Sequence, residues 1–171
     1  MKKRVFIVNG KPRAGKDTFA MMLNELVGVH KYSSVTKVKK LALEMGWDGK
    51  KTEKDRKFLS DLKMLTTEYS DMSFKDISEE VERFMRGDYD IYDKNVMLID
   101  IREPKEIDRA VKAFGAETIF IDNYNVEAIL SNTADANANI YTYDYDYFVL
   151  NDGTLDEFRN EVKEFYNNVI K

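Results

Sequence analysis

The residues best suited to chemistry stand near the N-terminus, in the string GKPRAGKDT from Gly10 to Thr18. Two glycines lie five positions apart and Lys16 follows the second directly, which is the spacing of a phosphate-binding loop. Glycine lets the backbone turn tightly, so that successive N–H groups point toward one anion. The pattern predicts that a nucleotide phosphate chain contacts nine consecutive residues: Gly10, Lys11, Pro12, Arg13, Ala14, Gly15, Lys16, Asp17 and Thr18.

Two charged residues of the loop have more specific predicted roles. Lys16 would bring a mobile cation to the β and γ phosphates of ATP. A helix that begins at about Lys16 would add the positive end of its dipole to the same place. Asp17 stands where Ser or Thr usually supplies a hydroxyl ligand for Mg²⁺, and Thr18 comes one position late. Carboxylate oxygens suit Mg²⁺, directly or through water; the alternative is that Asp17 caps the helix.

Strands alternate with helices around this loop. Short apolar runs predict five strands, at residues 4–9, 31–33, 95–101, 118–121 and 147–150. Helical spacing predicts helices from Asp17 to a stop at Gly28 and over residues 35–45, 53–69, 74–85, 104–114 and 154–170. Leu26, Met45 and Leu65 are placed on the inward faces of these helices. The alternation predicts an α/β fold in which helices cover both faces of a parallel sheet.

Length and composition restrict the class of protein. A chain of 171 residues without a linker or repeat is long enough for one domain. The absence of Cys excludes disulfides, thiolate zinc sites and cysteine nucleophiles, and agrees with a cytoplasmic protein. A net charge of −4 disfavours polymeric nucleic acid as a partner. The apolar run near the N-terminus is too short for a signal or a membrane span, so no membrane partner is expected.

Three segments resemble a known family. The GKDT form of the loop, Gly15 to Thr18, resembles that of deoxynucleoside monophosphate kinases of the phage type, and a similar GKD loop occurs in animal-type phosphomevalonate kinases. The segment LIDIREPKE (residues 98–106) is similar to that family's strand ending in Asp, followed by Arg. The stretch YFVLNDGTL (residues 147–155) is similar to its last strand and turn. The resemblance implies a three-layer P-loop NTPase fold of about five parallel strands, with ATP as phosphoryl donor and Mg²⁺ as cofactor.

The resemblance also implies roles for individual residues. Asp100 and Asp17 would hold the metal ion. Arg102 would bind the acceptor phosphate or the transferring group, because guanidinium pairs bidentately with phosphate; the alternative is a local ion pair between Asp100 and Arg102. Asn151 and Gly153 would lie near the donor base, unless their segment is a plain turn.

The acceptor side is expected in a helical insert at residues 35–93 of the single domain. Arg56 is the residue predicted to bind the acceptor phosphate there. Trp47 is expected to anchor the core, with a wall of the acceptor pocket as the alternative, and His30 is expected to carry no chemistry.

One departure from the family pattern concerns catalysis. Nucleotide kinases usually stabilise the transition state with arginines of a late lid. Here no Arg lies between Arg109 and Arg159, and no Lys lies between Lys112 and Lys163. Residues 129–146, where the lid is expected, carry only acidic and neutral side chains, including Asp135, Asp144 and Asp146.

Three explanations remain open for that missing charge. Lys11, Arg13 or Arg102 would supply it, with Lys16, Arg102 and Arg13 as the catalytic set. A second subunit of a homodimer would supply it. Or the protein binds nucleotide without efficient transfer. The sequence therefore predicts phosphoryl transfer from ATP to a (deoxy)nucleoside monophosphate. The alternatives are a kinase for another small phosphorylated acceptor, a nucleotide-sensing module and a purely structural protein.

Overall fold

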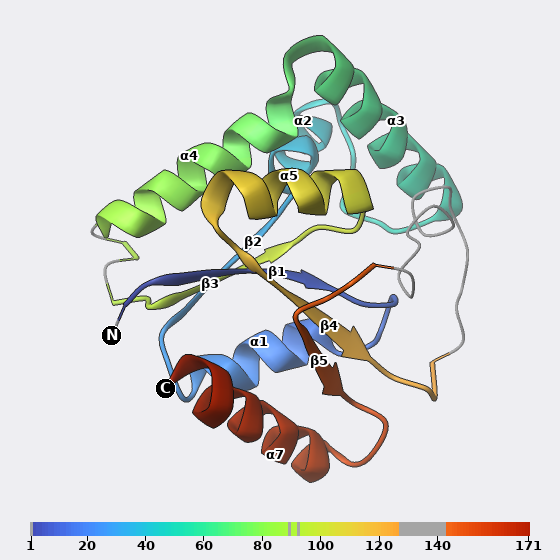
Figure 1. Cartoon of the computed structure of the whole chain (residues 1–171). Helices are drawn as coiled ribbons and strands as arrows, with labels where there is room; N and C mark the ends of the chain where they lie inside the picture. The colour runs from blue at the N-terminus through green and yellow to red at the C-terminus, as the bar shows by residue number, and fades with distance from the viewer. Residues whose placement is uncertain (1, 89, 92, 127–142) are drawn as a thin grey trace.

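A parallel sheet lies at the centre of the computed structural model, which describes residues 2–88, 90–91, 93–126 and 143–171 (Figure 1). Its strands run in the order β2–β3–β1–β4–β5. Their bounds are β1 Arg4–Asn9, β2 Val29–Ser33, β3 Val96–Asp100, β4 Glu117–Asp122 and β5 Tyr147–Leu150. The predicted α/β class and the parallel sheet are confirmed.

The register of the sheet brings the predicted chemistry to one edge. Val8 of β1 lies opposite Asp100 of β3, and Ser33 of β2 lies opposite the same residue from the other side. Asn9 and Gly10 follow Val8 directly, so the start of the phosphate loop and Asp100 share the carboxyl edge of the sheet. This edge is where open α/β sheets bind their ligands.

Helices cover both faces of the sheet. They are α1 Lys16–Asn24, α2 Thr36–Glu44, α3 Glu53–Ser70, α4 Met72–Arg86, α5 Pro104–Phe114 and α7 Leu155–Phe165, which continues into the π-helical turn η1 Tyr166–Ile170. Helices α1 and α7 pack on one face, whereas α4 and α5 pack on the other. The arrangement therefore has three layers.

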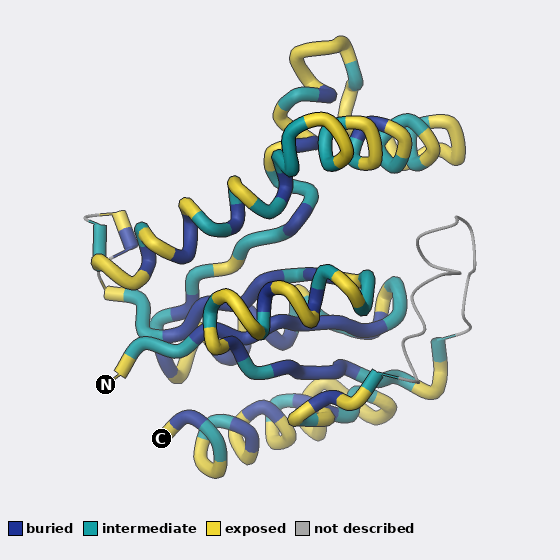
Figure 2. The backbone as a smooth tube through the Cα atoms, turned by 45° about the horizontal axis from the view of Figure 1, so that its top comes forward, coloured by how far each residue is buried: buried dark blue, intermediate teal, exposed yellow. Residues whose placement is uncertain are grey.

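The central strand shows why the sequence forms this sandwich. Phe6 and Val8 belong to the core under α1 and α7, while Val5 and Ile7 belong to the core under α4 and α5. Alternate residues of a strand point to opposite faces, so a strand buried on both sides must be apolar throughout. Figure 2 shows the result as continuous burial along the middle strands.

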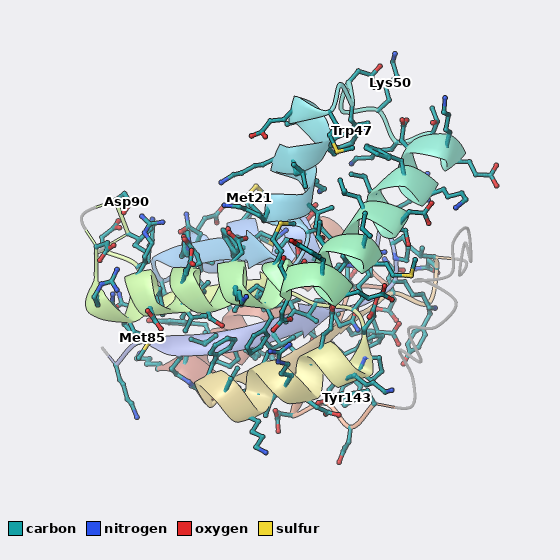
Figure 3. The ribbon with its side chains drawn as sticks, turned by 90° about the horizontal axis from the view of Figure 1, so that it is seen from above. Met21, Trp47, Lys50, Met85, Asp90 and Tyr143 are labelled. Carbon is teal, nitrogen blue, oxygen red and sulfur yellow. The ribbon has the colours of Figure 1, made fainter. Side chains whose placement is uncertain are left out.

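Between β2 and β3 the chain forms a helical insert of α2, α3 and α4. Val38, Ala42 and Leu62 form a separate small core between α2 and α3. Trp47 packs against this core, as predicted for an anchor, and its Nε1 donates to the carbonyl oxygen of Lys50 at 2.9 Å. Figure 3 shows Trp47 and Lys50 together at one end of the molecule.

The prediction that three apolar helix residues face the core is wrong. Leu26, Met45 and Leu65 are 36%, 59% and 63% exposed. Leu26 lies beyond α1, which ends at Asn24, and Met45 is the residue at which α2 stops. Leu65 lies in α3, whose underlying core is too small to cover the whole apolar stripe. Among the described residues, no helix has the length and apolarity required to cross a bilayer.

Candidate phosphate-binding site

At both glycine positions of the loop, a neighbouring group lies so close that a side chain would not fit. Gly10 has φ 150°, and a Cβ there would overlap the carbonyl oxygen of Ile121 in the neighbouring strand β4. Gly15 has φ 102°, and a Cβ there would overlap the side-chain amide of Asn151. Positive φ combined with this crowding excludes other residues. The two glycines that define the sequence motif are thus fixed by geometry as well as by spacing.

The ammonium of Lys16 lies inside the loop. Its Nζ donates to the carbonyl oxygens of Gly10 at 2.7 Å and Lys11 at 2.9 Å. Burial, reinforced by the positive charge of Arg102, lowers the pKa of Lys16 to about 8. A cation that is desolvated and close to a second cation is poised to gain from an incoming phosphate.

The rest of the loop has a defined environment. The N–H of Ala14 donates to the carbonyl of Lys11 at 3.1 Å, and Ala14 is fully buried. Arg13 has the left-handed φ of 68° and is exposed, whereas Pro12 and Thr18 are half-buried. A left-handed non-glycine residue is uncommon and costs about 1 kcal/mol. The helix α1 begins at Lys16, as predicted, so its first turn adjoins the loop.

Two asparagines hold the loop from either side. Asn151 was predicted to lie near the nucleotide, and its Nδ2 donates to the carbonyl of Ala14 at 2.8 Å. Asn9 was missed by the sequence analysis. Its Oδ1 accepts from the N–H of Gly10 at 2.8 Å, while its Nδ2 donates to the Tyr145 hydroxyl at 2.8 Å and the Arg102 carbonyl at 3.2 Å. A polar residue that ends an otherwise apolar strand was the available signal.

Asp17 does not cap helix α1. The N-cap is Gly15, with no side-chain capping bond, and the Asp17 carboxylate instead forms an ion pair with Lys31. The Nζ of Lys31 also lies 3.1 Å from Oδ2 of Asp100. One lysine of β2 therefore bridges the two carboxylates predicted to hold a metal ion. Lys31 was missed, because it stands in a short strand that carries no recognisable motif.

The charges of this cluster shift its pKa values in opposite directions. The hydrogen bond from Lys31 lowers the pKa of Asp17. Burial raises the pKa of Asp100, and Lys31 opposes that effect. Burial alone would lower the pKa of Lys31, but its contacts with Asp17 and Asp100 outweigh burial and the net shift is upward.

The carboxylates of Asp17 and Asp100 suit a metal ion that takes most of its other ligands from water and phosphate. Oδ1 of Asp100 is buried and has no hydrogen-bond partner in the part of the chain that the structure describes, so its capacity to accept from a donor or a cation is unmet. Among the described residues, no three His, Cys, Asp or Glu side chains converge on one point. Two carboxylates fit Mg²⁺, which usually takes one or two from protein and the rest from water and phosphate.

The other predicted site residues divide into two groups. Arg102 is brought to the loop: its carbonyl binds Asn9, and its charge acts on Lys16. Arg56 lies in the first turn of α3, where its Nε donates to the carbonyl of Lys51 at 3.3 Å. The positive charge of Lys51 makes the smallest contribution to the lowered pKa of Asp17, after the hydrogen bond from Lys31. Gly153 is packed against Glu157 of α7, and no described contact ties it to the loop.

A small cavity with a mainly apolar lining lies where α3, α4 and α5 meet the ends of β2 and β3. It encloses about 60 Å³ and includes residues of α3, α4 and α5. Thr67 and Ser73 line it, and their buried hydroxyls have no hydrogen-bond partner among the described residues. Ser34 and Ile101, which also line it, directly follow the strand ends at Ser33 and Asp100. A larger hollow of about 380 Å³ lies between α4 and α5 and contains none of the predicted site residues.

The predicted lid, residues 129–146, falls mainly outside the described residues. Near the C-terminal end of this segment, the hydroxyl of Tyr143, which is labelled in Figure 3, donates to Oδ1 of Asp108 in α5 at 2.8 Å. The carboxylate of Asp146 accepts from both the N–H and the hydroxyl of Thr118, each at 2.8 Å. Asp146 is therefore engaged with β4. His30 lies in β2, at the opposite edge of the sheet, where its Nε2 pairs with Glu80 at 2.7 Å and its ring stacks on Phe84.

Comparisons with known proteins agree with this architecture. No protein-family model and no curated protein sequence matches the chain. Among solved structures, the chain is similar to dephospho-CoA kinase from Campylobacter jejuni, with a TM-score of 0.57 and 17% identity over 96% of each chain.

Two further structures show the same likeness. A sugar kinase from a Janibacter species has a TM-score of 0.50 and 11% identity, covering 98% of this chain and 96% of that one. A Thermus thermophilus protein has a TM-score of 0.51 and 13% identity over 100% of both chains. The chain has the three-layer α/β fold of the P-loop kinases.

Proposed function

We propose that this protein transfers a phosphoryl group from ATP to a (deoxy)nucleoside monophosphate. The observation that carries the proposal is the position of Lys16, half-buried inside a two-glycine loop and close enough to Asp100 and Arg102 for their charges to act on it. This arrangement places cations and N–H donors where phosphate charge would be stabilised. The fold of the P-loop kinases supports the same reaction class.

On the donor side, the loop would hold the triphosphate. N–H groups between Gly10 and Thr18 bind phosphate oxygens, and Lys16 exchanges its two carbonyl partners for the β and γ phosphates. Asn9 and Asn151 act as positioning residues, because they tie the loop to the ends of the strands. The segment around Asn151 and Gly153 lies toward the donor base.

A bound Mg²⁺ would neutralise charge on the β and γ phosphates. Asp17 and Asp100 would hold it, since both carboxylates already converge on one cation and Oδ1 of Asp100 is unpartnered. The transition-state charge that a lid arginine would supply falls to Arg102, with Arg13 as the second candidate. Arg102 already acts electrostatically on Lys16.

On the acceptor side, the insert of α2, α3 and α4 would contribute the binding surface. Arg56 would bind the acceptor phosphate from the first turn of α3, where its Nε contacts the carbonyl of Lys51. The cavity with the Thr67 and Ser73 hydroxyls lies beyond the strand end at Asp100 and would receive the polar end of the acceptor. Buried polar groups without partners make a site selective for a ligand that pairs with them.

The test is a screen of acceptors for ADP release in the presence of Mg-ATP. Each common nucleoside and deoxynucleoside monophosphate is assayed, together with phosphomevalonate and dephospho-CoA. A sharp rise in turnover with one monophosphate is the expected result. Equal, near-zero rates with every acceptor remove the proposal.

A nucleotide-sensing module is the second candidate, and the absence of Arg and Lys from residues 129–146 favours it. It predicts nucleotide binding with no transfer to any acceptor. A preference for dephospho-CoA or phosphomevalonate in the same screen would instead identify a kinase for another small acceptor.

A further inference from the structure

Lys31 occupies the point at which the two candidate metal ligands meet. Its ammonium pairs with the carboxylate of Asp17 in α1 and lies 3.1 Å from Oδ2 of Asp100 in β3. Lys31 itself belongs to β2, so three separate elements converge on one charge. Neither the loop motif nor the acceptor insert accounts for this lysine.

The sheet register explains how Lys31 reaches the site. Lys31 pairs with Leu98, and Ser33 pairs with Asp100. Because residues two apart share a face of a strand, Lys31, Ser33, Leu98 and Asp100 are on the same face, where Leu98 packs in the core under α1. The four-carbon stem of the lysine thus extends along that face toward the carboxyl edge.

The cluster is built so that this cation can be exchanged. The side chain of Asp17 is 94% exposed, and that of Lys31 is 32% exposed. Releasing their contact therefore buries no uncompensated charge, since water replaces the partner. The Asp100 side chain is less exposed, at 24%, and no described residue partners its second oxygen, so it needs a cation more than Asp17 does.

We infer that Lys31 is the resident counter-ion of the metal-binding carboxylates, and that the divalent ion of a metal–nucleotide displaces its ammonium toward the phosphates. Two cations cannot share the same carboxylate oxygens, so ammonium and metal compete. The displaced ammonium remains tethered next to Lys16, with which it already interacts electrostatically. It then supplies one of the positive charges that residues 129–146 do not contain. The phosphate half of this inference rests on the proposed function.

The test compares Lys31→Met with the unmodified protein in two binding measurements that need no acceptor. The first is Mn²⁺ binding to nucleotide-free protein, followed by the electron paramagnetic resonance signal of free Mn²⁺. Removing the competing ammonium should tighten Mn²⁺ binding by roughly tenfold or more. The second is calorimetric titration with ADP in the presence of a chelator. Loss of the tethered cation should weaken metal-free ADP binding by about tenfold.

Opposite signs in the two measurements are the diagnostic result. A damaged fold would weaken both affinities, and a purely structural salt bridge would leave the ratio of the two unchanged. Either of these outcomes, or Mn²⁺ binding that is unchanged or weaker in Lys31→Met, overturns the inference. Lys31→Gln repeats the test if the Met variant does not fold, and Lys31→Arg, which keeps a cation, should behave like the unmodified protein.

Lys94→Met is the matched control. Lys94 pairs with Asp93 at 3.4 Å, just before β3 and thus at the end of the strand away from Asp100. Its loss should change neither affinity. If the unmodified protein binds no ADP, the proposed function fails, while the Mn²⁺ measurement still decides whether Lys31 competes with metal.

Discussion

The phosphate loop and the helical insert are held in place by different means. The loop is fixed by backbone contacts: Gly10 lies against the Ile121 carbonyl, and the Ala14 carbonyl binds Asn151. The insert depends on side chains: its small core lies around Leu62, which is the buried residue of α3, and Figure 2 shows the insert helices as largely exposed or half-buried. A loop held by backbone contacts requires particular residues at fixed spacing, whereas a core formed by side-chain packing tolerates many different sequences.

This difference separates the two halves of the proposed reaction. Donor binding should depend on a few residues that cannot be replaced. Acceptor binding should be distributed over several contacts of α3, α4 and α5, each with a moderate effect. Variants in the two regions therefore ought to affect different kinetic constants.

The largest effect is expected for Lys16→Met. This substitution removes the ammonium inside the loop but keeps an unbranched side chain that is only one atom shorter. Transition-state stabilisation by one preorganised donor contributes about 10²–10³ in rate, so kcat with the best acceptor should fall by that factor. Steady-state kinetics measures it. A fall of less than threefold, with the fold unchanged by circular dichroism, would mean that Lys16 is not part of the machinery.

Asn151→Ala and Arg56→Ala should separate the two regions. Without its bond to Ala14, the loop loosens, and nucleotide affinity should weaken by about tenfold, the equivalent of one buried hydrogen bond. Arg56→Ala should leave nucleotide affinity unchanged and raise the acceptor KM by about tenfold through loss of a phosphate contact. Calorimetry and kinetics give the two constants.

The chain offers controls for both variants. The Asn125 side chain donates to the carbonyl of Asp152, the residue after Asn151, at 2.6 Å, and no described hydrogen bond joins that side chain to the loop, so Asn125→Ala should preserve nucleotide binding. Lys57, next to Arg56, pairs with Asp61 on the exposed side of α3 and should be replaceable. Coupled changes in both constants from either Asn151→Ala or Arg56→Ala would erase the distinction between the regions.

A pH dependence should belong to the donor side alone. The pKa of Lys16 is lowered to about 8, mainly by burial, so the nucleotide-free loop loses its ammonium above that pH. Phosphate favours the charged form and raises the pKa in the complex. Binding therefore takes up a proton, and affinity for ADP should fall by up to about tenfold per pH unit above 8. Calorimetry at pH 7, 8 and 9 tests this; a flat profile, or one shared by Lys16→Met, contradicts it.

The smallest effect is expected for a substitution in the cavity that α3, α4 and α5 line. Ser73→Ala should raise the acceptor KM by about threefold, because a hydroxyl that pairs with the acceptor is lost. Stability should stay equal or rise slightly, by up to about 1 kcal/mol, since the hydroxyl is unpartnered in the protein itself. Ser78→Ala is the control on the same helix, where the hydroxyl already bonds to the Phe74 carbonyl at 2.8 Å. Loss of stability without a KM change would assign Ser73 to packing.

The sequence predicted what periodicity and spacing encode. The strand at Arg4–Asn9, the helix that begins at Lys16 and the helix at Pro104–Phe114 follow from local pattern, and all three are confirmed. That the loop between the first two binds phosphate stays a prediction. Lys31 and Asn9 could not be assigned, because their roles depend on which strands become neighbours. Asp17 was given two roles from its position alone, and the tertiary contact with Lys31 excludes capping. The prediction that Leu65 is buried was wrong for the same reason, because the extent of the core under α3 depends on tertiary packing and not on local sequence.

The central claim is that the loop from Gly10 to Thr18 binds nucleotide phosphates. Thermal unfolding with and without Mg-ATP tests this claim most directly. A ligand at a hundredfold excess over its dissociation constant stabilises the folded state by about 2.7 kcal/mol, which for a chain of this size raises Tm by roughly 5–10 °C. The account predicts that rise for the unmodified protein and its loss in Lys16→Met. An unchanged Tm at millimolar Mg-ATP, or an equal rise in both proteins, would contradict it.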